Sequence, residues 1–108
     1  MMVDGIAHLK ELGHGVLKYV RVTTKTGETV IRLFPNNDDH PHDEQVWADE
    51  NPVSAGFIKF DYDRRMWFRI FLKRSETLQL GPKPDEDGKL IGEGSGMEYL
   101  GTWDDTGR

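Results

Sequence analysis

The sequence predicts a single α+β domain built mainly from antiparallel β-hairpins. Two stretches, residues 16–34 and 55–74, alternate apolar and polar side chains around a central turn, which is the pattern of half-buried hairpin strands. A short helical pattern precedes them, and the length of 108 residues suits one domain, residues 1–108. We therefore expect five or six strands in a sheet or partly open barrel, with one or two short helices. The alternative is an all-β sandwich with an N-terminal helix.

A short helix is predicted near the start of the chain, from Asp4 to Leu12. Asp4 is a suitable N-cap residue, and Ile6, Leu9 and Leu12 recur near helical spacing. Gly13 can adopt the left-handed conformation that ends a helix. So short a helix persists only when its apolar side is packed.

The first hairpin is expected from Val16 to Phe34. Its turn is placed at Thr26 and Gly27, because glycine supplies the positive φ that tight turns need. This register makes one face apolar, and we predict that its residues are core: Val20, Val22, Ile31 and Leu33.

The same register places Arg21 and Arg32 beside each other on the opposite face of the first hairpin. Like charges at directly opposed positions repel. The pair therefore indicates an anion-binding site, an acidic loop or bulk water next to these two side chains.

The second hairpin is the clearest feature of the chain. With a turn at Asp63, Arg64 and Arg65, Tyr62 lies opposite Met66. This single register gives each face of the hairpin a distinct composition. One face then carries only apolar side chains or glycine. We predict that its residues are core: Ile58, Phe60, Phe68, Ile70 and Leu72.

The other face of this hairpin alternates aromatic rings with cations and is the candidate partner-binding surface. Its residues are Phe57, Lys59, Trp67, Arg69, Phe71 and Lys73. Rings and arginine are enriched at interfaces, where they carry much of the binding energy. We therefore expect Trp67 or Phe71 to stay partly exposed beside the cations.

The remaining segments are less regular. Residues 43–50 could form one or two helical turns that end before Asn51-Pro52, since the residue before proline resists helix. Toward the C-terminus we expect strands at residues 77–80, 89–92 and 97–103, a loop at 81–89 and a glycine-rich connection at 92–96. The polar tail, residues 104–108, is expected to fray.

The segment 38–44 collects the densest set of potential metal ligands, and its candidates are Asp39, His40 and His42. Metal ligands usually lie on rigid elements with supporting hydrogen bonds, whereas turn-forming residues flank this segment. We therefore predict a solvated, mobile connection without a metal or other cofactor. Nucleophilic triads and phosphate loops are not recognisable in the sequence either, which favours a protein that is not an enzyme.

The net charge of −5 is unevenly distributed along the chain. Residues 35–52 contain six acidic and no basic residues, whereas residues 53–80 contain six basic and three acidic residues. We therefore expect the acidic loops to fold near the basic strands.

The composition also bounds the cellular setting. The chain has no cysteine, which excludes disulfides and thiolate metal sites and fits a reducing compartment. No apolar run approaches the roughly 18 residues that span a bilayer. The N-terminus lacks the basic and apolar regions of a signal peptide. We expect a soluble, cytoplasmic protein with no membrane partner.

The favoured function is that of a small non-enzymatic protein that presents the basic aromatic face of the second hairpin to an acidic protein partner or to a second copy of itself. One alternative is single-stranded nucleic acid or another polyanion on the same face, with rings stacking on bases and cations meeting phosphates. The other is a metal-dependent enzyme or sensor that uses His40 and His42. Salt-dependent binding to an oligonucleotide separates the first two, and metal analysis isolates the third.

Overall fold

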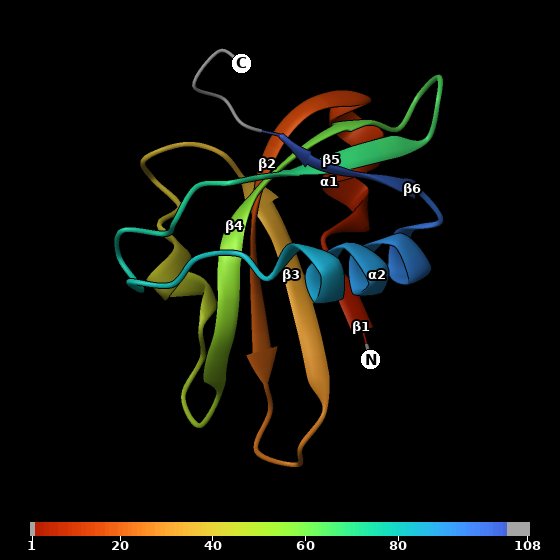
Figure 1. Ribbon diagram of the computed structural model, residues 1–108. Helices are drawn as coiled ribbons and strands as arrows, with labels where there is room; N and C mark the ends of the chain where they lie inside the picture. Colours follow the sequence, from red (N-terminus) through yellow and green to blue (C-terminus); the bar gives the residue numbers. More distant parts are fainter. Residues whose placement is uncertain (1, 104–108) are drawn as a thin grey trace.

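A computed structural model describes residues 2–103, and Figure 1 shows their arrangement. In chain order, the elements of this part are β1 (Met2–Asp4), α1 (Ile6–Leu12), β2 (His14–Thr23), β3 (Thr29–Pro35), the 3-10 helix η1 (His42–Gln45), β4 (Asn51–Asp61), β5 (Trp67–Phe71), α2 (Pro84–Ser95) and β6 (Glu98–Trp103).

Within residues 2–103 the six strands form one open sheet in the order β1-β3-β2-β4-β5-β6. The four central strands pair antiparallel, whereas each edge strand, β1 and β6, pairs in parallel with its neighbour. The expected α+β class is therefore confirmed, but the sheet is mixed rather than purely antiparallel. None of the helices in this part of the chain is long and apolar enough to cross a membrane.

The predicted register of the second hairpin is confirmed where β4 and β5 pair. Phe60 lies opposite Phe68, and Lys59 lies opposite Arg69. At the end of the hairpin away from the turn, the prediction that Leu72 is core is wrong, because β5 ends at Phe71 and Leu72 is 55% exposed. The backbone N–H of Leu72 bonds instead to the carbonyl of Trp103 in β6.

The first hairpin differs from its predicted register by one residue. The turn closes where the backbone N–H of Thr24 donates to the carbonyl of Glu28 and the backbone N–H of Glu28 donates to the hydroxyl of Thr24, with Gly27 at φ 87°. Val20 therefore lies opposite Arg32. A shift of one residue moves every side chain of one strand to the other face, so Arg21 and Arg32 do not become neighbours.

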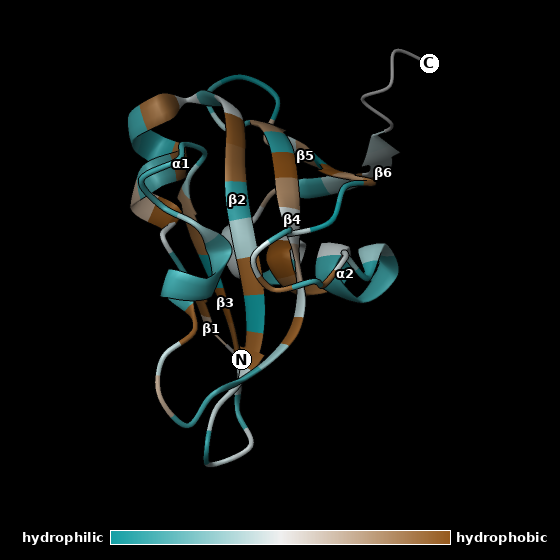
Figure 2. Ribbon diagram, turned by 90° about the vertical axis from the view of Figure 1, so that its left-hand side faces the viewer, coloured by the Kyte–Doolittle hydropathy of each residue, from teal (hydrophilic) through white to brown (hydrophobic). Residues whose placement is uncertain are grey.

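Both faces of the sheet carry a core. The inner core lies under α1 and α2 and comprises Leu9, Leu17, Tyr19, Ile31, Leu33, Ile58, Phe60, Phe68, Ile70, Ile91 and Met97. The outer core lies on the opposite face and comprises Val20, Val22, Val30, Phe34 and Ala55. Figure 2 shows the resulting alternation of hydrophobic and hydrophilic bands along β2. Val20 and Val22 are thus buried as predicted, but on the other face from Ile31 and Leu33.

Helix α2 replaces most of the predicted loop at 81–89, the predicted strand at 89–92 and most of the predicted glycine-rich connection at 92–96, whereas residues 81–83 remain a loop. Pro84 occupies the first turn, where its missing N–H costs nothing, and three acidic residues there favour the positive end of the helix dipole. Gly96, at φ 77°, ends the helix and donates its N–H to the carbonyl of Gly92.

A glycine explains how α2 approaches the sheet closely. A Cβ atom at Gly88 would lie 2.4 Å from the ring of Tyr99 in β6. At this contact, the backbone of α2 at Gly88 packs directly on the aromatic ring of Tyr99 in β6.

The N-terminal helix and the other irregular segments are partly as expected. Helix α1 ends at Gly13 as predicted, but Asp4 belongs to β1 and the N-cap is Gly5 at φ 95°. The predicted helical turns at 43–50 shorten to η1, and residues 77–80 form a turn closed by the bridge between Ser75 and Leu80. The strand expected at 97–103 is confirmed as β6. The tail, residues 104–108, lies outside the described residues.

Candidate functional site: a basic aromatic face of the sheet

The outer face is the side of the sheet that carries the outer core, and it is divided into a covered half and an open half. The covered half contains the outer core and lies beneath η1 and the turn at 72–82. Val46, which follows η1, and Leu78 and Leu80 of the turn pack on it. The open half is formed where β2, β4, β5 and β6 continue beyond this cover. Its side chains are His14, Val16, Lys59, Asp61, Trp67, Arg69, Glu98 and Trp103.

An acidic strap, residues 36–50, crosses the covered half and is held there by basic side chains. The Nζ of Lys18 donates to the carbonyls of Asn37 and His40 over 3.0 and 3.1 Å. Arg32 donates to the carbonyl of Gln45 over 2.8 Å. The predicted apposition of an acidic loop and basic strands is therefore confirmed for this segment.

Arg32 forms the strongest attachment of the strap. Its guanidinium donates two hydrogen bonds to the carboxylate of Glu50, over 2.6 and 2.7 Å, and lies 3.5 Å from the ring centroid of Trp47. These hydrogen bonds hold the pKa of Glu50 below its usual value, although partial burial opposes the shift. Arg32 is only 5% exposed, so an external anion does not reach it.

Arg21, which was predicted to share an anion site with Arg32, lies on the inner face instead. It contacts Glu86 at 3.1 Å and Asp87 at 3.2 Å, both from α2. The structure therefore pairs Arg21 with Glu86 and Asp87 of α2 and pairs Arg32 with Glu50, and it does not bring the two arginines together.

His42 is a structural residue of the strap. It is 3% exposed, its Nε2 donates to the carbonyl of Gly56 over 2.9 Å, and its ring stands edge-on between Phe34 and Phe57. Burial is the main cause that holds the pKa of His42 below its usual value, and the charge of Lys18 adds to it. The expectation of a solvated segment is therefore wrong at His42, because two aromatic rings enclose it.

The other metal-ligand candidates do not converge on His42. His40 is half-buried and Asp39 is exposed. Within residues 2–103, no group of three His, Asp or Glu side chains is arranged to hold a metal ion.

The open half combines two indole rings with two cations. The Nζ of Lys59 lies 4.1 Å from the ring centroid of Trp103, and Arg69 donates to the carbonyl of Leu100 over 3.0 Å. Among residues 2–103, neither cation has a carboxylate partner within 4.0 Å. Trp67 and Trp103 are half-buried, so part of each ring faces solvent.

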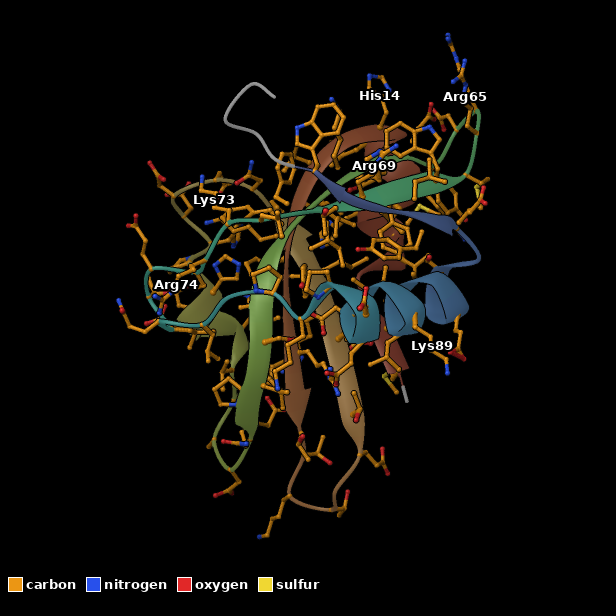
Figure 3. The ribbon with its side chains drawn as sticks, viewed as in Figure 1. His14, Arg65, Arg69, Lys73, Arg74 and Lys89 are labelled. Carbon is orange, nitrogen blue, oxygen red and sulfur yellow. The ribbon has the colours of Figure 1, made fainter. Side chains whose placement is uncertain are left out.

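A hollow of about 520 Å³ opens at the end of this half, beside the hairpin tip. His14, Lys59, Arg64 and Trp67 contribute to its lining, and Figure 3 shows His14 and Arg69 on the same side of the molecule. The carboxylate of Asp61 also lines it but accepts the backbone N–H of Arg64 over 3.0 Å, which stabilises the turn.

The six predicted site residues fall into three groups. Lys59, Trp67 and Arg69 lie on the open half, and the expectation that Trp67 or Phe71 stays partly exposed is met by Trp67. Phe57 and Phe71 lie at its boundary with the covered half, where Phe71 is only 8% exposed. Lys73 follows β5 and is exposed, with its Nζ 4.8 Å from the ring centroid of Phe57.

Two residues of the open half were missed by the sequence analysis. Trp103 lies in a strand that was predicted, but its position beside Phe71 depends on the unforeseen helix α2, which returns the chain parallel to β5. His14 precedes the predicted first hairpin and pairs with Asp61. The alternation of His14 with Val16 is the signal that could have extended that hairpin.

A second polar cluster lies buried between α2 and the inner face. The carboxylate of Asp87 accepts hydrogen bonds from the Tyr19 hydroxyl at 2.5 Å, the Ser54 hydroxyl at 2.8 Å and the Lys83 backbone N–H at 2.9 Å, in addition to Arg21. Burial, followed by the charge of Asp87, raises the pKa of Tyr19. Because Asp87 is 0% exposed, this cluster ties α2 to the sheet and offers no access to a substrate.

No protein-family model matches this chain, and neither a curated protein nor a solved structure is significantly similar to it.

Proposed function

We propose that this protein is a small non-enzymatic binding protein whose open half holds an acidic segment of a protein partner. The observation that carries the proposal is the position of Lys59 and Arg69 between the half-buried rings of Trp67 and Trp103. Part-exposed rings beside cations suit an interface, because rings provide apolar contact area and cations select an acidic partner.

The acidic strap supports this choice of partner. On the covered half, the same sheet face already holds a segment with six acidic residues. Arg32 binds the carboxylate of Glu50 and stacks on the strap residue Trp47, and Lys18 donates to two backbone carbonyls of the strap. A partner segment on the open half would use the same chemistry, with Lys59 and Arg69 in the place of Lys18 and Arg32.

Nucleic acid fits the surroundings less well. The strap places the exposed carboxylate of Asp38 in the hollow that Lys73 and Arg74 also line, and the net charge of the chain is −5. Both features repel any anionic ligand, but a phosphate backbone carries one charge per nucleotide along its whole length and is therefore repelled more strongly than a peptide segment with a few acidic residues.

The test is fluorescence anisotropy with a labelled peptide rich in Asp and Glu, titrated with the full chain. Lys59→Gln and Arg69→Gln should each weaken binding, and Trp67→Ala should weaken it by about 2 kcal/mol, roughly 30-fold. Lys89→Gln is the matched control, because Lys89 is an exposed cation on α2, away from the open half (Figure 3).

Two outcomes would overturn the proposal. One is tighter binding of a labelled oligothymidine than of the acidic peptide at the same salt concentration. The other is concentration-dependent dimerisation, measured by sedimentation, that Trp67→Ala abolishes while no acidic peptide binds; the surface would then join two copies of the chain.

A further inference from the structure

A groove runs along the boundary between the open half and the covered half. It consists of two adjoining hollows of about 210 and 380 Å³ that share Asn36, Phe57 and Lys73. Strap residues form one lip, and the segment after β5 forms the other. The groove therefore separates the strap from Lys73 and Arg74, which Figure 3 labels at the left of the view.

The floor of the groove is aromatic and fixed. Phe57 stands edge-on to His42, with centroids 5.2 Å apart, and Phe71 stands edge-on to Trp103, with centroids 6.4 Å apart. The hollow over this floor, about 210 Å³, is smaller than the roughly 300 to 1,000 Å³ of small-molecule sites. Its size suits a single apolar side chain.

Cations lie around this apolar floor. The Nζ of Lys73 lies 4.8 Å from the ring centroid of Phe57, and one nitrogen of Arg74 donates to the carbonyl of Gln79 over 2.7 Å. Within residues 2–103, neither side chain has a carboxylate within 4.0 Å. Asp38 and Glu76 also line the wider hollow, so it is not uniformly basic.

The order of side chains along the sheet sets the spacing of a ligand. Lys59 and Arg69 form one row, and Phe57 and Phe71 occupy the next row on the same face. Lys73 follows the end of β5 and is not part of the strand, but its Nζ reaches to 4.8 Å from the ring centroid of Phe57. Successive side chains on one face of a strand are about 6.6 to 6.8 Å apart, and an extended peptide has the same repeat.

We propose that this groove binds the apolar side chain of an extended acidic segment in which acidic residues stand two positions before and after a bulky apolar residue. The apolar side chain lies on Phe57 and Phe71. One acidic side chain lies against Lys59 and Arg69, and the other lies against Lys73. The inference rests on the proposed function and adds the sequence pattern of the partner.

The experiment compares three labelled peptides of equal length and net charge. The first has Asp-Ser-Phe-Ser-Asp at its centre, the second replaces Phe by Ala, and the third exchanges Phe with the neighbouring Ser. We expect the first peptide to bind about tenfold more tightly than either of the others, since an apolar anchor contributes on the order of 1.4 kcal/mol or more.

Variants of the protein locate the interaction. Lys73→Gln should weaken the first peptide at least threefold, whereas Lys89→Gln, on α2, should leave it unchanged. Phe57→Leu preserves bulk beside His42 and should reduce the difference between the Phe and Ala peptides. Amide NMR shifts that the Phe peptide causes at Phe57, Phe71 and Lys73 would report contact with the groove itself.

The outcomes separate the two proposals. Equal binding of the Phe and Ala peptides would overturn the groove inference while the proposed function stands. Equal binding of the Phe peptide and its shifted form would overturn the spacing and with it the groove inference. Binding of none of the three would overturn the proposed function and the inference together.

Discussion

His42 donates its Nε2–H to the carbonyl oxygen of Gly56 over 2.9 Å, and this bond attaches the acidic strap to β4. The same ring fills the space between Phe34 and Phe57. A protonated imidazole would place a second N–H and a positive charge in this enclosed space, with the charge of Lys18 nearby. Neutral His42 therefore holds the strap on the sheet more stably than the protonated form does.

The first prediction concerns stability below neutral pH. The pKa of His42 is lowered in the folded state from the ordinary value of 6.5, so the unfolded chain binds more protons in this range. The contribution of His42 is therefore fully present above pH 6.5 and is lost as the pH falls through the folded pKa. Urea unfolding between pH 7.5 and about 5 should show this loss.

His42→Leu serves as the control for this titration, because it removes the ionisable group but keeps an apolar side chain between the rings. Its free energy of unfolding should change less between pH 7.5 and about 5 than that of the natural chain. Glu50, whose pKa is also lowered, acts in a lower window, below its ordinary value of 4.5, and should affect both proteins alike. Identical pH dependence of the two proteins would contradict the assignment to His42.

The second prediction compares two neighbouring carboxylates that contact the same arginine. Asp87 is fully buried and accepts hydrogen bonds from Tyr19, Ser54 and Arg21, so Asp87→Ala leaves these donors unpaired. We expect a loss of about 3–5 kcal/mol in the free energy of unfolding. Glu86→Gln should cost about 0–1 kcal/mol, since that side chain is 61% exposed. Chemical denaturation measures both, and similar losses would contradict the role assigned to Asp87.

The third prediction uses two glycines of α2 that should respond with opposite signs. Gly88→Ala drives a methyl group into the ring of Tyr99 and should destabilise the protein by about 1–3 kcal/mol. Gly94 is exposed in the same helix, and Gly94→Ala should stabilise it by about 0.5–1 kcal/mol through helix propensity. Thermal melting distinguishes them. A stabilising Gly88→Ala would show that α2 does not approach β6 as closely as described.

The fourth prediction tests the register of the second hairpin. Phe68 is fully buried in the inner core, and Phe68→Ala should cost about 3–5 kcal/mol. Leu72 was expected to share that face but is 55% exposed, so Leu72→Ala should stay within about 0.5 kcal/mol. A melting curve unchanged by Phe68→Ala would reject the pairing of β4 with β5.

The sequence was most informative where local signals agreed. In the second hairpin, the turn and the alternation indicate the same register, and the pairing of Phe60 with Phe68 followed. In the first hairpin, one additional turn residue was enough to place Arg21 and Arg32, which were predicted on the same face, on opposite faces of the sheet. Turn length depends on the backbone conformation near Gly27, and the alternation of the strands does not reveal it.

Helix α2 and the division of the outer face could not be derived from local pattern. Five of the residues from 84 to 96 are glycine or proline, and such a composition is typical of a loop. Packing of Gly88 on Tyr99 and the bonds of Asp87 override that propensity. The covered and open halves alternate in the same way along β4, so only the path of the strap distinguishes Phe57 from Lys59.

The parallel edges of the sheet have a consequence for the order of folding. The four central strands pair antiparallel, whereas β6 joins β5 only after α2 has carried the chain back across the sheet. Closing such a connection costs chain entropy before any contact repays it, so we expect β6 to dock late. Trp103 therefore completes the surface around Lys59 only in a fully folded chain. Incompletely folded molecules would lack that ring, and the ability to bind would itself report that folding is complete.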